Sequence, residues 1–148
     1  MFTNILVPLD GSRFAERALE PAIQMAQKFD ATILLVRVFT PELEPIAAGM
    51  SLRYPELSSI HERNECELAE SYLRSIRAQW LGMEVPMATR VMTGSAPEMI
   101  QEAAMQAGTD LIVMSTHGRS GFSRLLYGSV AEAVLRGTHL PVLLIPIK

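Results

Sequence analysis

The hydrophobic positions of this chain form two alternating kinds of segment. Short, nearly continuous apolar runs are typical of strands that are buried on both faces, and the longer segments between them repeat apolar residues at the helical period. In the third run, Pro86 and Arg90 favour the edge of a sheet. The runs predict five strands, over residues 5–9, 32–38, 85–92, 110–114 and 141–147.

Four amphipathic segments predict helices. Ser12 can cap the first helix, since a serine hydroxyl accepts a hydrogen bond from a free N–H at a helix start. The fourth helix covers about residues 129–136. We expect the first helix to run unbroken to residue 29, with an apolar face formed by Phe14, Ala18, Ala22, Met25 or Ala26, and Phe29.

Two pairs of a serine and a glutamate three residues apart predict helix starts of the capping-box type. Ser59 and Glu62 would open a long second helix that ends near residue 81, and Ser95 and Glu98 would open the third. Before the second helix, residues 40–57 contain three prolines and a glycine and predict an irregular connection.

Alternating strands and helices predict an α/β fold. Parallel strands joined by right-handed helical crossovers form an open doubly wound sheet with helices on both faces. We predict a single domain over residues 1–148, with a Rossmann-like five-stranded parallel sheet in the order 3-2-1-4-5. Ligands of such sheets bind beyond the carboxyl ends of the strands, where the strand order reverses.

Three segments converge on that edge of the predicted sheet. Asp10 follows the first strand, Val38 closes the second, and Ser115 to Gly118 follow the fourth. The last segment leads through a glycine-containing loop to Gly128 at the start of the fourth helix. A helix start offers free N–H groups and the positive end of the helix dipole, so this arrangement suits a phosphate.

Composition excludes several functional classes. A net charge of −3 argues against general nucleic-acid binding, and no apolar run is long enough to span a membrane. The N-terminal residues lack the features of a signal peptide, so the cytoplasm is the expected compartment. The single cysteine, Cys66, is expected to be a buried structural thiol. His61 and His139 have no ligand spacing, so we predict no protein metal site.

The motif around the loop resembles that of a known family. The chain lacks G-x-x-x-x-G-K-[ST], and it has no G-x-G-x-x-G after the first strand. It contains Ser115-x-x-Gly118, nine further residues, and then Gly128-Ser129. With the opening Val-Pro-Leu-Asp-Gly-Ser of residues 7–12 and the closing Pro-Val-Leu-Leu-Ile-Pro of residues 141–146, this pattern closely resembles the universal stress protein family over nearly the whole chain.

The resemblance implies an adenine nucleotide alpha hydrolase-like fold and an ATP site. ATP-binding members carry G-x-x-G, nine residues, then G-[ST], so Ser115 replaces their first glycine. Serine fits there if its φ is negative and costs about 1 kcal/mol if φ must be positive. By position, the phosphates would contact Gly118, Gly128, Ser129 and Val130, and the adenine and ribose would contact Pro8, Asp10, Val38, Met114 and Ser115.

Two charged residues keep alternative interpretations. Asp10 could accept a hydrogen bond from the nucleoside or lie near a magnesium ion, or it could be a turn residue or helix cap. Arg119 could contact a phosphate or be an ordinary surface charge. A plain loop residue is the simpler interpretation of His117.

The resemblance implies an ATP-binding regulatory protein of the stress response, using ATP with Mg²⁺ and acting on an unknown protein partner. The alternatives are a dimeric interaction module of the same family that binds no nucleotide, and a slow ATPase. No base for water is evident, which favours binding over hydrolysis. We also expect a homodimer that pairs through Val142–Ile145, because an apolar edge strand invites pairing.

Overall fold

The computed structural model describes residues 1–41, 53–116 and 127–147. Its five strands form one parallel sheet in the order β3-β2-β1-β4-β5, as predicted. The strands are β1 (Asn4–Leu9), β2 (Thr32–Phe39), β3 (Met87–Thr93), β4 (Leu111–Ser115) and β5 (Val142–Ile145). The helices are α1 (Arg13–Glu16), α2 (Leu19–Phe29), α4 (Pro55–Gln79), α5 (Ala96–Gln106) and α6 (Ser129–Gly137), with a 3-10 turn η1 (Leu81–Met83).

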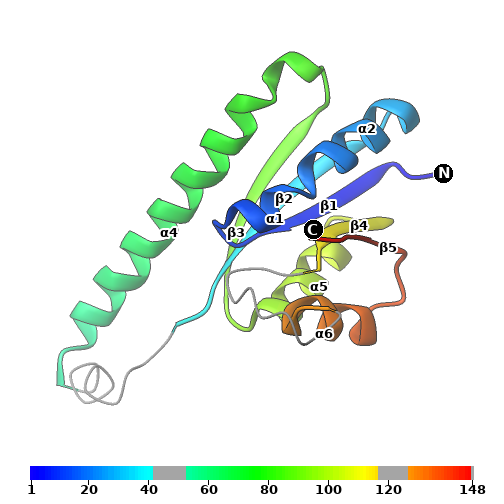
Figure 1. The fold of residues 1–148 in the computed structure, drawn as a ribbon. Coiled ribbons are helices and arrows are strands. Elements are labelled where there is room, and N and C mark those ends of the chain that lie inside the picture. The colour runs from blue at the N-terminus through cyan, green and yellow to red at the C-terminus, as the bar shows by residue number, and fades with distance from the viewer. Residues whose placement is uncertain (42–52, 117–126, 148) are drawn as a thin grey trace.

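Helices cover both faces of this sheet (Figure 1). On one face, α1, α2 and the C-terminal part of α4 bury a cluster that includes Ile5, Ile33 and Leu73. On the other face, α5 and α6 bury a second cluster that includes Leu6 and Val134. Strand β3 is an edge strand, which confirms the prediction from Pro86 and Arg90.

The predicted first helix is instead two helices. A hydrogen bond of the 3-10 kind, from Ala18 N–H to the Ala15 carbonyl, closes α1, and α2 begins at Leu19. Pro21 explains the break, because it has no N–H to donate to the carbonyl of Arg17 and its ring crowds that turn. Phe14, in the short helix α1, is 40% exposed, whereas the sequence predicted a buried position.

The predicted capping box at Ser59 and Glu62 is wrong. Helix α4 begins a turn earlier, at Pro55, because proline suits the first turn of a helix, where its missing N–H has no intrahelical acceptor to lose. The Ser59 hydroxyl lies inside the helix and donates to the Pro55 carbonyl, 3.2 Å away. The irregular connection therefore ends before residue 57.

Other helix starts and the cysteine differ in detail. Helix α5 begins after Ser95 as predicted, but the Ser95 side chain makes no capping hydrogen bond. Cys66 is half-buried rather than buried, with its Sγ 3.9 Å from Thr93 Oγ1 at the end of β3. No helix within the described ranges is long and apolar enough to cross a membrane.

Candidate functional site

Strands β1 and β4 are paired over only part of their length. Strand β1 pairs with β2 from Asn4 to Leu9, but its register with β4 covers only Ile5 and Leu6. Both strands continue beyond that point, to Leu9 and to Ser115. The ladder thus stops where the strand order reverses, between β2 on one side of β1 and β4 on the other. We call this end of the sheet the carboxyl edge.

Pro8 gives a physical reason for the interrupted ladder. Just before β1, the Thr3 carbonyl accepts from Thr32 N–H of β2. The next carbonyl, that of Asn4 in β1, accepts from the N–H of Asp110, the residue before β4, and each bond is 2.9 Å long. Backbone groups of successive strand residues point to opposite sides, so those of Pro8 point to β4. Proline has no N–H. The donor that would continue the β1–β4 ladder is therefore missing.

Asp10 is held in a tight turn just past β1. Its Oδ1 accepts from the N–H of Ser12 at 2.9 Å and from the Ser12 hydroxyl at 2.5 Å. Ser12 Oγ accepts in turn from Ala15 N–H at 3.1 Å, so Ser12 caps α1 as predicted and Asp10 does not. Gly11 between them has φ +85°, a conformation that favours glycine. The turn fixes the Asp10 carboxylate at the carboxyl edge.

Helix α4 brings a tyrosine to the same edge. The Tyr72 hydroxyl donates to Glu16 Oε1 at 2.9 Å. Burial raises the pKa of Tyr72, the hydrogen bond and charge of Glu16 and the charge of Asp10 raise it further, and Arg37 opposes them. The phenol is therefore neutral at physiological pH. Sequence reasoning missed Tyr72, since 56 positions separate it from Glu16 and no local spacing links the two.

Three of the predicted contacts for the nucleoside and phosphate lie together. Val38, Met114 and Val130 belong to one apolar cluster on the side of the sheet covered by α5 and α6. Val38 and Met114 are almost fully buried, at 9% and 5% exposure. Pro8 is half-buried and pairs in register with Val36 of the same cluster.

The start of α6 lies beside the end of β4. Gly128 is the N-cap, with φ −60°, and no side chain caps the helix. Ser129 is exposed and Val130 is half-buried. The Gly128 N–H donates to the carbonyl of Thr116, whose own N–H donates to the Ile145 carbonyl of β5 at 3.0 Å.

Ser115 is the last residue of β4 and is 7% exposed. Among the described residues, positive φ outside glycine occurs at Asp30 and Glu84, so Ser115 is free of the left-handed strain considered above. Gly118, Arg119 and His117 lie outside the described residues, and their predicted roles stay predictions.

The opposite end of the sheet, which we call the amino edge, is joined by hydrogen bonds to a carboxylate. Asp110 Oδ2 accepts from both the N–H and the hydroxyl of Thr3 at 2.8 Å, and Oδ1 accepts from Asn4 N–H at 3.1 Å. Desolvation alone would raise the pKa of Asp110, but these bonds and the N-terminal charge outweigh it and lower the pKa below its usual range. This aspartate links the starts of β1 and β4.

A cavity of about 380 Å³ also lies at the amino edge, lined by residues that include Asn4, Leu34, Arg90 and Thr109. None of the predicted site residues lines it. Over residues 1–41, 53–116 and 127–147, no three His, Cys, Asp or Glu side chains are grouped as metal ligands could be.

Comparison with known proteins gives one family. The model of the universal stress protein family matches residues 1–146. A curated relative, universal stress protein MJ0531 of Methanocaldococcus jannaschii, is 32% identical over 145 residues, which are 98% of this chain and 82% of the relative.

Solved structures share the fold. The structure of MJ0577, a universal stress protein of Methanocaldococcus jannaschii, has a TM-score of 0.86 at 24% identity and covers 100% of this chain and 98% of its own. A universal stress protein in complex with cAMP has a TM-score of 0.70 at 21% identity, covering 99% and 98%. A family member from Arabidopsis thaliana with AMP bound has a TM-score of 0.65 at 15% identity, covering 99% and 92%.

Proposed function

This chain belongs to the universal stress protein family, and on that premise we propose that it is a regulatory protein of the stress response that binds an adenine nucleotide at the carboxyl edge of its sheet. The nucleotide is ATP, taken up with Mg²⁺. Relatives with the same fold hold cAMP or AMP, which supports the adenine nucleotide class.

The observation that carries the proposal is the early end of the β1–β4 ladder. Beyond Leu6 and Ile112 the two strands are not paired, and the missing Pro8 donor lies at the point where strand order reverses. Doubly wound sheets bind ligands at that point, because the loops on its two sides lead to opposite faces of the sheet.

The surrounding residues divide by chemistry. Pro8, Val38 and Met114 offer an apolar wall for the base. The fixed Asp10 carboxylate would accept a hydrogen bond from the nucleoside or attract the Mg²⁺ that accompanies the phosphates. The start of α6, with no side-chain cap, would give the N–H groups of Ser129 and Val130 and the Ser129 hydroxyl to the phosphates. Gly118 and Arg119 complete the proposed set.

Isothermal titration with ATP and MgCl₂ tests the site. We expect 1:1 binding, and at least about tenfold weaker binding for Asp10→Asn, since a lost charge-assisted hydrogen bond costs about 1.5–3 kcal/mol. Asparagine retains an oxygen that can accept from Ser12, so the turn survives. Asp30→Asn, which removes a charge near the amino edge, is the matched control. No heat and no thermal stabilisation of the wild type at millimolar ATP would sink the proposal.

Binding without efficient hydrolysis is the expected behaviour. Glu16, a second carboxylate at this edge, is engaged by the Tyr72 hydroxyl. Steady-state phosphate release that Asp10→Ala abolishes, with ATP binding retained, would establish a slow ATPase instead.

A second candidate function is a dimeric interaction module that needs no nucleotide. It is favoured by β5, an edge strand whose Leu143 is 37% exposed. We propose that Val142–Ile145 pairs with the same strand of a second copy. Light scattering at micromolar concentration should give a dimeric mass, and Leu143→Lys should lower it. A monomeric mass for the wild type would contradict this pairing.

A further inference from the structure

Helix α4 has two apolar stripes on different sides. The first, with Ala69, Leu73 and Ile76, is buried against the sheet. The second consists of Leu57, Ile60 and Leu68, which are 50%, 53% and 64% exposed. With Asn64, these residues are spaced by three, four and four positions, so they share one side of the helix. We call Leu57, Ile60, Asn64 and Leu68 the outer stripe.

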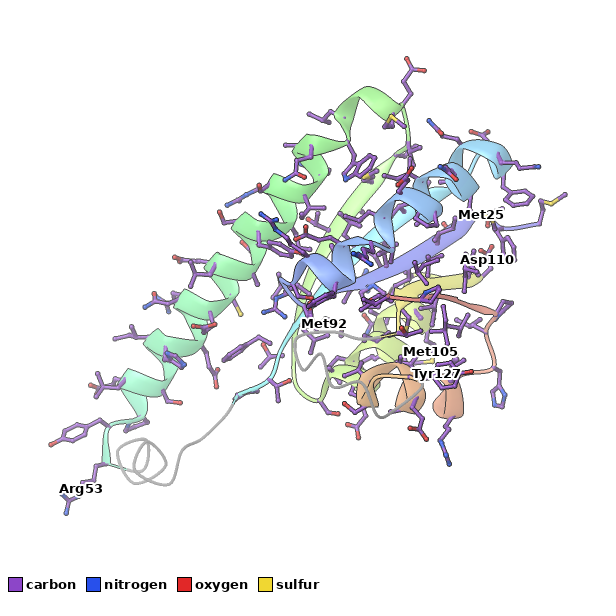
Figure 2. All side chains as sticks on the ribbon, viewed as in Figure 1. Met25, Arg53, Met92, Met105, Asp110 and Tyr127 are labelled. Atoms are coloured by element: carbon purple, nitrogen blue, oxygen red, sulfur yellow. The ribbon has the colours of Figure 1, made fainter. Side chains whose placement is uncertain are left out.

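The N-terminal part of α4, which carries Leu57 and Ile60, extends past the sheet (Figure 1), and Asn64 and Leu68 follow beside the end of the sheet. The His61 ring packs edge-on against Phe39 with centroids 6.2 Å apart, and Cys66 contacts Thr93, so the sheet ends near the middle of the helix. Figure 2 shows Arg53 at the far tip, away from the rest of the molecule. A helix of this kind, with large apolar side chains half or more exposed, is typical of an interface.

The charges beside the outer stripe are self-complementary. If two copies of this helix pack antiparallel with Ile60 on the two-fold axis, Glu56 of each lies beside Arg63 of the other. Neither residue forms an ion pair with another residue of the described ranges.

We propose that residues 53–68 form a self-association surface, on which the helix packs antiparallel against the same segment of a second copy. Ile60 contacts its own equivalent, and two Glu56–Arg63 ion pairs related by the two-fold axis lie beside the seam. The apolar seam is short, so we expect a dissociation constant of about 10–100 μM. The proposal does not depend on nucleotide binding or on pairing through β5.

Sedimentation of the full chain with the change Leu143→Lys, which blocks β5, isolates this contact. Arg63→Glu places two carboxylates side by side and should weaken self-association at least tenfold. Adding Glu56→Arg reverses both charges and should restore it to within about threefold. Arg74→Glu changes an exposed arginine of the same helix outside the outer stripe and should have no effect. Unchanged circular dichroism and ATP titration would show that each variant is folded.

A cross-link tests the register directly. In a Cys66→Ser background, Ile60→Cys should give a disulfide-linked dimer on oxidation, because the two thiols meet at the axis. Glu70→Cys, exposed on another side of the helix, should not. The proposal is overturned if the full chain with Leu143→Lys alone shows no association up to millimolar concentration. It is also overturned if Glu56→Arg does not rescue Arg63→Glu, or if Ile60→Cys and Glu70→Cys cross-link equally.

Discussion

The two edges of the sheet treat the same pair of strands in opposite ways. At the amino edge, β1 and β4 are tied by the Asp110 carboxylate and by the Asp110 N–H. At the carboxyl edge, the ladder between them has ended, and Asp10 is bonded within its own turn. Asp110 therefore joins the two strands at the amino edge, whereas Asp10 lies beside their unpaired ends at the carboxyl edge. The difference separates a carboxylate that joins two strands from one that we propose as a ligand contact.

The largest expected effect is on the aspartate of the amino edge. Asp110→Ala removes the acceptor of three hydrogen bonds and should lower the free energy of unfolding by about 2 kcal/mol, allowing for partial solvent access. Urea denaturation measures this, with exposed Glu70→Ala as the control. Affinity for ATP at the carboxyl edge should stay within twofold of the wild type. A stable Asp110→Ala protein would end the distinction between the edges.

Acid should remove the same contribution. The pKa of Asp110 is lower in the folded chain than in the unfolded chain, so its stabilisation is fully present above the unfolded pKa of about 3.9 and lost as pH falls through the folded pKa. The difference in unfolding free energy between the wild type and Asp110→Asn should therefore shrink below about pH 4. A difference that stays constant from pH 7 to pH 3 would assign the effect to shape rather than charge.

Pro8 tests the carboxyl edge. Pro8→Ala returns an N–H that points to β4 and should extend the ladder, so we expect about fivefold weaker ATP binding with unfolding free energy unchanged or raised. Titration calorimetry and urea denaturation on the same preparation check both parts. Tighter nucleotide binding in this variant would show that the missing donor does not keep the strands apart.

The smallest effect is expected at Ser115. Because Ser115 is not in a left-handed conformation, Ser115→Gly should change ATP affinity by less than about twofold and cost up to about 1 kcal/mol of stability, the usual penalty of glycine in a strand. A large gain in affinity would show that the side chain obstructs the nucleotide.

Sequence patterns predicted the sheet well because its buried strands are continuous apolar runs. The edge position of β3 and the Ser12 cap follow from local chemistry, whereas the order of strands follows from the usual topology of doubly wound sheets. Local patterns failed where two signals compete. Pro21 interrupts an otherwise helical apolar face, and Pro55 starts α4 a turn before the capping box at Ser59.

The candidate site was predictable in its local parts only. Asp10 and the Gly128-Ser129 helix start follow from the chain order of strand, turn and helix. Two hydrogen bonds join residues far apart in sequence, so no spacing indicates them. They are the bond from Tyr72 to Glu16 and the bond from Thr3 to Asp110. The end of the β1–β4 ladder at Pro8 could be recognised only from the strand register, because the hydrogen-bond partners of neighbouring residues show which strand the Pro8 backbone faces.

Helix α4 carries the only cysteine of the chain, and the only tryptophan follows directly after the helix. Cys66 lies at its middle, and Trp80 follows its last turn and packs against the core. Fourteen residues of helix separate them by about 21 Å. A dye attached to Cys66 and the indole of Trp80 would therefore form an energy-transfer pair along the helix. The efficiency of transfer would report bending of the helix without any engineered residue.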